Sequence, residues 1–154
     1  FANFQGLPHR LQYLRDFHGV KYYDDNFSTN LSSTQVALAA FPTQPLVLIA
    51  GGRDKTDNQD LPDLARLFTA TPNLRHLILI GESGRALAPL LPTELYTLAP
   101  DLQSAVSLAR QHAEALVAPA VTPIALMSPA AASFDMFKNV YDRGAKFQNL
   151  VNSF

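Results

Sequence analysis

The stretch LVLIAGGRDK (Leu46–Lys55) decides the fold, because an unbroken apolar segment leads directly into two glycines and three charged residues. Leu46–Ala50 is apolar at every position, and His76–Ile80 (HLILI) is apolar at every position after its histidine. Parallel strands that are covered on both faces have such continuous apolar sequences, whereas half-exposed strands alternate apolar and polar residues. We therefore predict a parallel sheet with helices packed on both of its faces.

The same pattern extends outward along the chain, where strand-like segments alternate with segments that carry an apolar stripe at helical spacing. This alternation predicts an α/β fold with a doubly wound, mainly parallel sheet in three αβα layers. The predicted strands are Val20–Asp24, Leu46–Ala50, Leu74–Ile80, Glu94–Leu98 and Thr122–Met127. The predicted helices are Ser32–Phe41, Asp60–Ala70, Ser83–Leu91 and Leu102–Leu116, with a last helical pair after Phe134 that is interrupted at Gly144.

Length and composition fit a single domain over residues 1–154, long enough to bury its own core. A net charge of −1 with 16 % charged residues gives no argument for binding nucleic acid or an anionic membrane, which favour basic patches. The absence of cysteine excludes disulfides and zinc–thiolate sites and fits a reducing compartment. No apolar run approaches the roughly 20 residues that span a bilayer. The start, FANFQGLPHR, has neither a methionine nor a signal-peptide pattern, so we expect a piece of a longer protein.

Polar clusters follow four of the predicted strands, where the strands end and loops lead into helices. In an open parallel sheet these carboxyl ends share one edge, and ligands bind in the crevice beside it. We therefore expect side chains that are far apart in the sequence to share one site. The clusters are DDNFSTN (Asp24–Asn30), GGRDK (Gly51–Lys55), GESG (Gly81–Gly84) and SPAAAS (Ser128–Ser133).

Two of these clusters have more than one interpretation. GGRDK lacks the G-x-x-x-x-G-K-[ST] spacing of a P-loop, and its glycines permit either a tight turn or a close approach to a ligand. Lys55 is accordingly either a solvated lysine or the partner of an anion. We expect a helix to open at Phe134–Asp135, whose amides suit a carboxylate or phosphate, and Ser133 is equally suited to cap it. Pattern alone favours the turn and the cap.

The adjacent Asp24 and Asp25 do not form a metal or paired-carboxylate site in our interpretation, because neighbouring strand side chains point to opposite faces. The polar side chains of Ser28–Asn30 can cap the helix that follows. The four histidines have no metal-ligand spacing, and His76, inside a predicted strand, is expected to be structural. The residues alone thus predict an α/β domain with a crevice suited to anions.

Four blocks carry a resemblance that covers essentially the whole chain. They are GLPHR (Gly6–Arg10), DDNFSTN (Asp24–Asn30), GGRDK (Gly51–Lys55) and SPAAASFDMFKNVYDRG (Ser128–Gly144). In order and spacing they resemble the Rossmann-like C-terminal domain of the Mur ligase family, in its D-glutamate-adding branch (MurD). The last block is the most specific, because SPA-x-ASFD-x-F-K-x-x-x-x-RG is long and peculiar to this branch.

The resemblance implies an ATP-dependent ligase of the bacterial cytoplasm that adds D-glutamate to UDP-N-acetylmuramoyl-L-alanine during peptidoglycan precursor synthesis. ATP phosphorylates the alanine carboxylate, the amine of D-glutamate attacks the acyl phosphate, and Mg²⁺ bridges the phosphates. Positioning and charge stabilisation carry such transfers. The resemblance further implies a monomeric three-domain enzyme whose other domains hold the UDP-sugar, the P-loop and the metal ligands, so that this domain alone is inactive.

The residue roles that the family implies fall on the same loops. No catalytic or metal-binding residue is implied within this domain. The implied contacts are Arg10 with the ATP phosphates, Asp25 with the ribose or base, and Thr29, Lys55, Ser133 and the Phe134 backbone with D-glutamate.

Three residues depart from the family pattern. Phe27 stands where a lysine is common, Val140 stands where a phenylalanine often lines the amino-acid pocket, and Ala131 replaces a frequent cysteine. Tyr141 is placed to fill the space of that phenylalanine. Two alternatives therefore stay open, namely a ligase for another acidic amino acid and a freestanding amino-acid- or nucleotide-binding module without catalysis.

Overall fold

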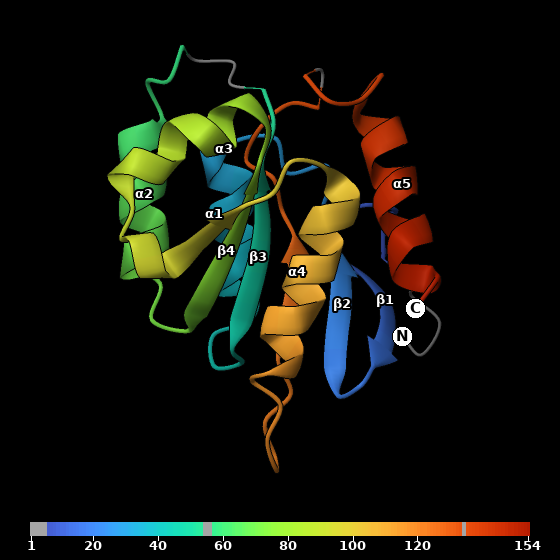
Figure 1. The fold of residues 1–154 in the computed structure, drawn as a ribbon. Coiled ribbons are helices and arrows are strands. Elements are labelled where there is room, and N and C mark those ends of the chain that lie inside the picture. The colour runs from blue at the N-terminus through green and yellow to red at the C-terminus, as the bar shows by residue number, and fades with distance from the viewer. Residues whose placement is uncertain (1–5, 54–56, 134) are drawn as a thin grey trace.

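The computed structural model describes residues 6–53, 57–133 and 135–154, and in these ranges six strands form one sheet in the order β1-β2-β6-β3-β4-β5 (Figure 1). The strands are β1 Gln12–Phe17, β2 Val20–Asp24, β3 Leu46–Gly51, β4 Leu74–Ile80, β5 Tyr96–Leu98 and β6 Ile124–Met127. The helices are α1 Leu31–Ala39, α2 Leu61–Ala70, α3 Gly81–Leu87, α4 Leu102–Glu114 and α5 Val140–Asn152, with short 3-10 turns at Ala88–Leu90 and Thr93–Leu95. No helix in the described ranges is long and apolar enough to cross a membrane.

The predicted three-layer α/β architecture is confirmed. Strands β2, β6, β3, β4 and β5 are parallel to one another, and β1 alone among the described strands runs antiparallel to its neighbour, β2. Along β3, Leu46 and Leu48 belong to the core under α1–α3, whereas Val47 and Ile49 belong to the core under α4 and α5. A strand buried on both faces has no solvent side, which is why LVLIA is apolar at every position. Figure 1 shows α4 and α5 on the face nearer the viewer.

Strand β1 was missed by the sequence analysis, because it lies at the edge of the sheet. Its residues are half-buried or exposed, and Arg15 and Asp16 interrupt any apolar run. β1 pairs with β2 through a tight hairpin, with an irregularity between Tyr13 and Arg15. Charged side chains and a bulge are common at sheet edges, where they also block pairing with other chains.

The last helix differs from the prediction in both its start and its continuity. The helix expected to open at Phe134–Asp135 begins at Val140, where Asn139 is the N-cap and its Oδ1 accepts a bond of 2.9 Å from the Asp142 amide. Asp135 serves another element, since its carboxylate accepts a bond of 2.8 Å from the Glu82 amide in the first turn of α3. The prediction that Ser133 caps this helix is therefore wrong.

Gly144 lies inside α5 and does not interrupt it. A Cβ added there would stand 2.6 Å from His9 Cε1 and 2.9 Å from Asn26 Nδ2. The glycine thus permits α5 to approach the loops that precede β1 and follow β2, and its helix penalty of about 1 kcal/mol is offset by that packing.

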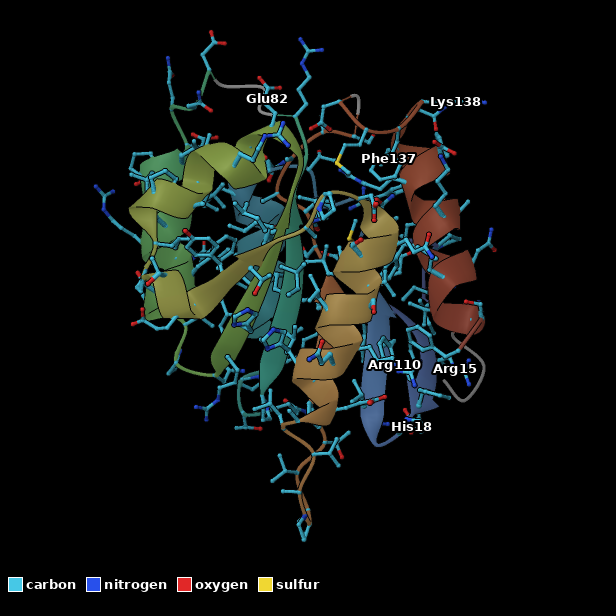
Figure 2. All side chains as sticks on the ribbon, in the orientation of Figure 1. Arg15, His18, Glu82, Arg110, Phe137 and Lys138 are labelled. Carbon is cyan, nitrogen blue, oxygen red and sulfur yellow. The ribbon has the colours of Figure 1, made fainter. Side chains whose placement is uncertain are left out.

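The end of the molecule opposite these loops is closed by cation–aromatic packing. The guanidinium carbons of Arg15 and Arg110 lie 4.9 and 4.6 Å from the centroid of the Phe17 ring. Figure 2 shows Arg15 and Arg110 at this end, and Glu82 and Phe137 at the other, where the loops gather. The packing joins α4 to the edge strand β1 without involving the loop edge.

Two stacked histidines lie between β4 and α4. The rings of His76 and His112 have centroids 3.8 Å apart, and His76 Nε2 lies 2.8 Å from Thr97 Oγ1 on β5. Burial, and then the neighbouring His112, lower the pKa of His76 from 6.5 to about 4. These contacts support the structural role that its place in a strand predicts.

We expect the free energy of unfolding to decrease as the pH falls from 6.5 towards 4, and His76→Gln to remove part of that decrease. The folded pKa lies below the unfolded one, so the unfolded chain takes up the proton first and stability is lost as the pH falls. Because His76 is only half-buried, we expect a contribution of about 1 kcal/mol between pH 7 and pH 5 after solvent screening. Urea unfolding of both proteins at the two pH values measures it, and equal losses would contradict the assignment.

Candidate functional site

The loops that follow β2, β3, β4 and β6 are joined to one another at the carboxyl edge of the sheet, as the sequence predicts. The bonds between them involve backbone groups, so their geometry does not depend on flexible side chains. They place the loops after β2 and β3 on either side of the loop after β6, which is the central one. The bonds are Asp25 N to Met127 O at 2.8 Å, Gly51 N to Pro129 O at 2.8 Å, Arg53 N to Ala132 O at 2.7 Å and Ser83 N to Gly52 O at 2.8 Å.

A hollow of about 360 Å³, here called the first hollow, opens among these loops. It brings together Arg10, Thr29 and Ser133, three of the residues that the resemblance assigns to ligands. Ser133 lies more than 100 positions from both Arg10 and Thr29, so only the topology brings it to them. The complete lining is Arg10, Phe27, Thr29, Ala132, Ser133, Val140 and Tyr141.

Ser133 is the buried polar residue of the first hollow. It is 2 % exposed, and its Oγ has no hydrogen-bond partner among the described residues. Its backbone carbonyl is used, since it accepts bonds from the amides of Met136 and Phe137 at 3.3 and 3.0 Å. Buried hydroxyls are normally paired, so this one is a donor available to a bound oxygen atom.

Aromatic rings form one side of the first hollow, at the position where the family commonly has a lysine. The Phe27 ring packs against His9 and Tyr141 with centroids 5.2 and 5.6 Å apart, and the guanidinium carbon of Arg10 lies 5.6 Å from its centroid. Val140 and Tyr141 both line the hollow, which agrees with the expectation that Tyr141 occupies space there. At this position the guanidinium of Arg10 therefore lies over an aromatic ring, where cation–π attraction holds it.

A second hollow of about 290 Å³ lies beside the first, against α1. Arg10 lines both hollows, and Asp25 lines this one. The Asp25 carboxylate accepts bonds from the Leu11 amide at 3.1 Å, from the Ser128 hydroxyl at 2.7 Å and from the Ser28 hydroxyl. Burial raises the pKa of Asp25 above its usual value, and these hydrogen bonds offset only part of that rise. The second hollow is lined by Arg10, Leu11, Asp25, Ser28, Ser33, Val36 and Ala37.

Asp24 points away from Asp25, as alternation along a strand requires. Its carboxylate lies 2.6 Å from His9 Nδ1 and accepts a bond of 2.7 Å from Gln148 Nε2 on α5. Asp24 is fully buried. The two carboxylates therefore have separate partners, which is the divergence that the sequence analysis expected.

Arg143 is a site-forming residue that the sequence analysis did not single out. It is fully buried, and it donates to Asn26 Oδ1 at 2.5 Å, to Asn26 O at 3.1 Å and to Ala131 O at 3.1 Å. Burial lowers the pKa of Arg143 to about 10, against the opposing influence of Asp135 and Asp24. Arg143 fixes the loop after β2 against the loop after β6, which are two walls of the first hollow. In the sequence, Arg143 is seen only as the arginine of the RG pair that ends the last block, and nothing there indicates its burial or its partners.

The glycines of GGRDK serve packing between loops. Gly52 has φ of 149°, and a Cβ there would overlap the carbonyl oxygen of Ala132. The close approach that the sequence suggested is thus one of backbone to backbone. Lys55 and Phe134, which the resemblance assigns to D-glutamate, lie outside the described residues.

Metal binding finds no support in the described part of the chain, where no three His, Asp, Glu or Cys side chains form a group able to hold a cation. Asp24, Asp25, Asp135 and Asp142, which are close in sequence to residues lining the first hollow, are already bonded to protein groups. The described residues therefore do not fit Mg²⁺, and we derive no step through it.

Comparison with known proteins finds ligases that are similar to this chain over nearly its whole length. No family model matches the chain. It is 40 % identical over 154 residues to the UDP-N-acetylmuramoylalanine--D-glutamate ligase of Geobacter metallireducens, a match covering 97 % of the chain. The ligases of the same name from Streptococcus agalactiae and Clostridium tetani are 37 % and 31 % identical, over 99 % and 98 % of the chain. The chain spans about a third of the length of these relatives, 31 % of the first and 32 % of the others.

The fold is also found among solved structures of Mur ligases. The MurF ligase of Thermotoga maritima, in complex with ADP, superposes with a TM-score of 0.60 at 15 % sequence identity. The match covers 99 % of this chain and 33 % of that one. At this identity the likeness concerns the fold alone.

Proposed function

The chain belongs to the Mur ligase family, as its sequence blocks indicate, and from this premise we propose that it is the C-terminal, amino-acid-binding domain of a D-glutamate-adding ligase. The whole protein uses ATP to join D-glutamate to the alanine carboxylate of UDP-N-acetylmuramoyl-L-alanine. It acts as a monomer in the cytoplasm, and the P-loop, the UDP-sugar site and the metal ligands lie in other domains. The chain alone is therefore inactive.

The observation that carries this proposal is the unpartnered Ser133 hydroxyl in a hollow that Arg10 also lines. A carboxylate has oxygens that accept from a buried hydroxyl and a charge that a nearby guanidinium stabilises. Thr29 adds a second hydroxyl-bearing residue to the same lining. An apolar ligand would leave the Ser133 hydroxyl unpaired, so the hollow favours an acidic one.

Holding the amino acid through its carboxylates suits the chemistry. The amine of D-glutamate must stay free to attack the acyl phosphate carbon, where the new C–N bond forms as the phosphate leaves. Ser133 and Thr29, with Lys55 and the Phe134 backbone as the resemblance implies, contact carboxylate oxygens and leave that nitrogen uncommitted. This domain thus contributes by orienting the nucleophile, a contribution that lowers the entropic part of the barrier.

The nucleotide is assigned to the second hollow. Arg10 lines both hollows, so its guanidinium is placed to meet phosphate oxygens at their border. Asp25 lines the second hollow, where we assign it to the ribose or base. This arrangement puts the phosphates beside the amino acid, as transfer through an acyl phosphate requires.

We expect Ser133→Ala to raise the KM for D-glutamate by about tenfold or more, because a hydrogen bond to a charged group contributes roughly 1.5–3 kcal/mol. The fold should not suffer, since the hydroxyl has no partner among the described residues. Steady-state kinetics of the intact protein, with D-glutamate varied at saturating ATP, measure the effect. The KM for ATP should stay within twofold of the unmodified protein.

Ser83→Ala is the matched control. Ser83 is also buried, and its Oγ likewise has no partner among the described residues, but it lines a separate internal cavity beneath α3. It should leave both KM values unchanged. Equal effects of the two variants would remove the support for the carboxylate site. Preference for L-glutamate or D-aspartate over D-glutamate would favour a ligase for another acidic amino acid, and binding without any turnover would favour a freestanding module.

A further inference from the structure

Arg10 stands at the tip of a strained loop. The residues on either side of it, His9 and Leu11, have φ of 60° and 43°, in the left-handed region that residues other than glycine rarely adopt. Such conformations persist only where surrounding contacts enforce them, and they concentrate at functional sites. The contacts that hold this tip therefore decide where the guanidinium lies.

The backbone on both sides of Arg10 is fixed by hydrogen bonds. The His9 carbonyl accepts a bond of 3.1 Å from the Phe27 amide, and the His9 amide donates to Gln12 Oε1 at 3.0 Å. On the other side, the Leu11 amide donates to an Asp25 carboxylate oxygen at 3.1 Å. The tip is thus tied to the loop after β2 at two points and to the start of β1 at a third.

A partly buried polar cluster below the tip completes these contacts, and it is formed by His9, Gln12, Asp24 and Gln148. Gln148 Nε2 donates to Asp24 Oδ2 at 2.7 Å and to Gln12 Oε1 at 3.0 Å. The same Asp24 oxygen lies 2.6 Å from His9 Nδ1. One side chain of α5 therefore links the carboxylate that holds the His9 ring to the amide oxygen that holds the His9 backbone.

We propose that Asp24 and Gln148 are positioning residues for Arg10, acting through the strained His9–Leu11 tip to hold its guanidinium at the border of the two hollows. The inference rests on the proposed function, in which Arg10 contacts the phosphates of ATP. Neither residue touches the hollows, so neither is a ligand contact. Their effect on catalysis passes through Arg10, and the second bond of Asp24, which it accepts from the Asn26 amide at 2.9 Å, makes Gln148 the cleaner position to test.

A double-mutant cycle in the intact protein tests this coupling. Gln148→Met keeps the length of the side chain and removes its hydrogen-bond donor. We expect it to lower kcat/KM for ATP about tenfold, which is also the smallest loss that we expect for Arg10→Ala. In the Arg10→Ala background the same change should cost less than twofold, because there is no guanidinium left to position. Asn149→Met, at an exposed neighbour on α5, should have no effect in either background.

The possible results distinguish a failure of the positioning role of Gln148 and Asp24 from a failure of the assignment of Arg10 to ATP. Equal losses from Gln148→Met with and without Arg10 would show a general structural role and overturn the inference, as would an unchanged kcat/KM. An unaffected Arg10→Ala protein would instead overturn the assignment of Arg10 to ATP. Asp24→Asn, which keeps the shape and removes the charge, is the second variant if Gln148→Met unfolds, and it should show the same dependence on Arg10.

Discussion

Replacing Arg143 by methionine is expected to lower the free energy of unfolding by about 3 kcal/mol, which is a large share of the stability of a domain of this size. Arg143 is fully buried and donates to three oxygen atoms, two of Asn26 and one of Ala131. Methionine fills a similar volume but has no donor. The three acceptors would be left buried without a partner, at about 1 kcal/mol or more for each.

A second effect of the substitution acts in the opposite direction. Burial lowers the pKa of Arg143 to about 10, which shows that the charge is held in the interior at a cost in free energy. An apolar side chain relieves that cost, so the loss is smaller than the sum of the three orphaned acceptors. Arg143→Lys keeps the charge but cannot reproduce the fork of donors, and we expect it to recover only part of the stability.

Lys146→Met on the same helix is the matched control for Arg143→Met. Lys146 is exposed, and its amine lies 3.1 Å from the Asp142 carboxylate in an i,i+4 pair. Such surface pairs contribute about 0.5 kcal/mol or less. Urea unfolding of the variants compares these values directly. A loss below about 1 kcal/mol for Arg143→Met would contradict the view that this residue fastens the two loops together.

The layers of the fold could be predicted from the sequence because they follow from burial. A strand covered on both faces is apolar at every position, which identified β3 and most of β4 in Leu46–Ala50 and His76–Ile80. β1 lacks that signature because one of its edges and much of its surface face water. The start of α5 could have been found, since Asn139 and Asp142 have the spacing of a helix N-terminus, but the serine of SPAAAS offered a competing cap.

The sequence predicted only those site residues that the strand order brings together or that a family motif contains. Strand order brings Arg10, Thr29 and Ser133 to one hollow, and the family pattern named all three. The bonds from Arg143 to Asn26 and from Gln148 to Asp24 join residues 117 and 124 positions apart. Local periodicity does not indicate which distant residues will pair, so these positioning residues could not be predicted from the sequence.

Gly52→Ala is expected to damage stability and ligand binding together. Gly52 has φ of 149°, a backbone region that is essentially restricted to glycine, and an added Cβ would overlap the carbonyl oxygen of Ala132. Relief requires the backbone to move, which breaks the pair of hydrogen bonds between Arg53 and Ala132, of 2.7 and 3.0 Å. Conformational strain and the lost bonds together suggest a loss of about 3 kcal/mol in the free energy of unfolding.

The same movement reaches the first hollow, because Ala132 and Ser133 line it. The KM for D-glutamate should therefore rise in any Gly52→Ala protein that still folds. Gly6→Ala is the control, since Gly6 also has a positive φ, of 73°, but a Cβ there meets no atom within 4 Å. It should cost about 1 kcal/mol from backbone strain alone and leave the KM unchanged. If the two variants unfold at the same urea concentration, the contact between Gly52 and Ala132 does not hold the loops, and the hollow owes its shape to Arg143 alone.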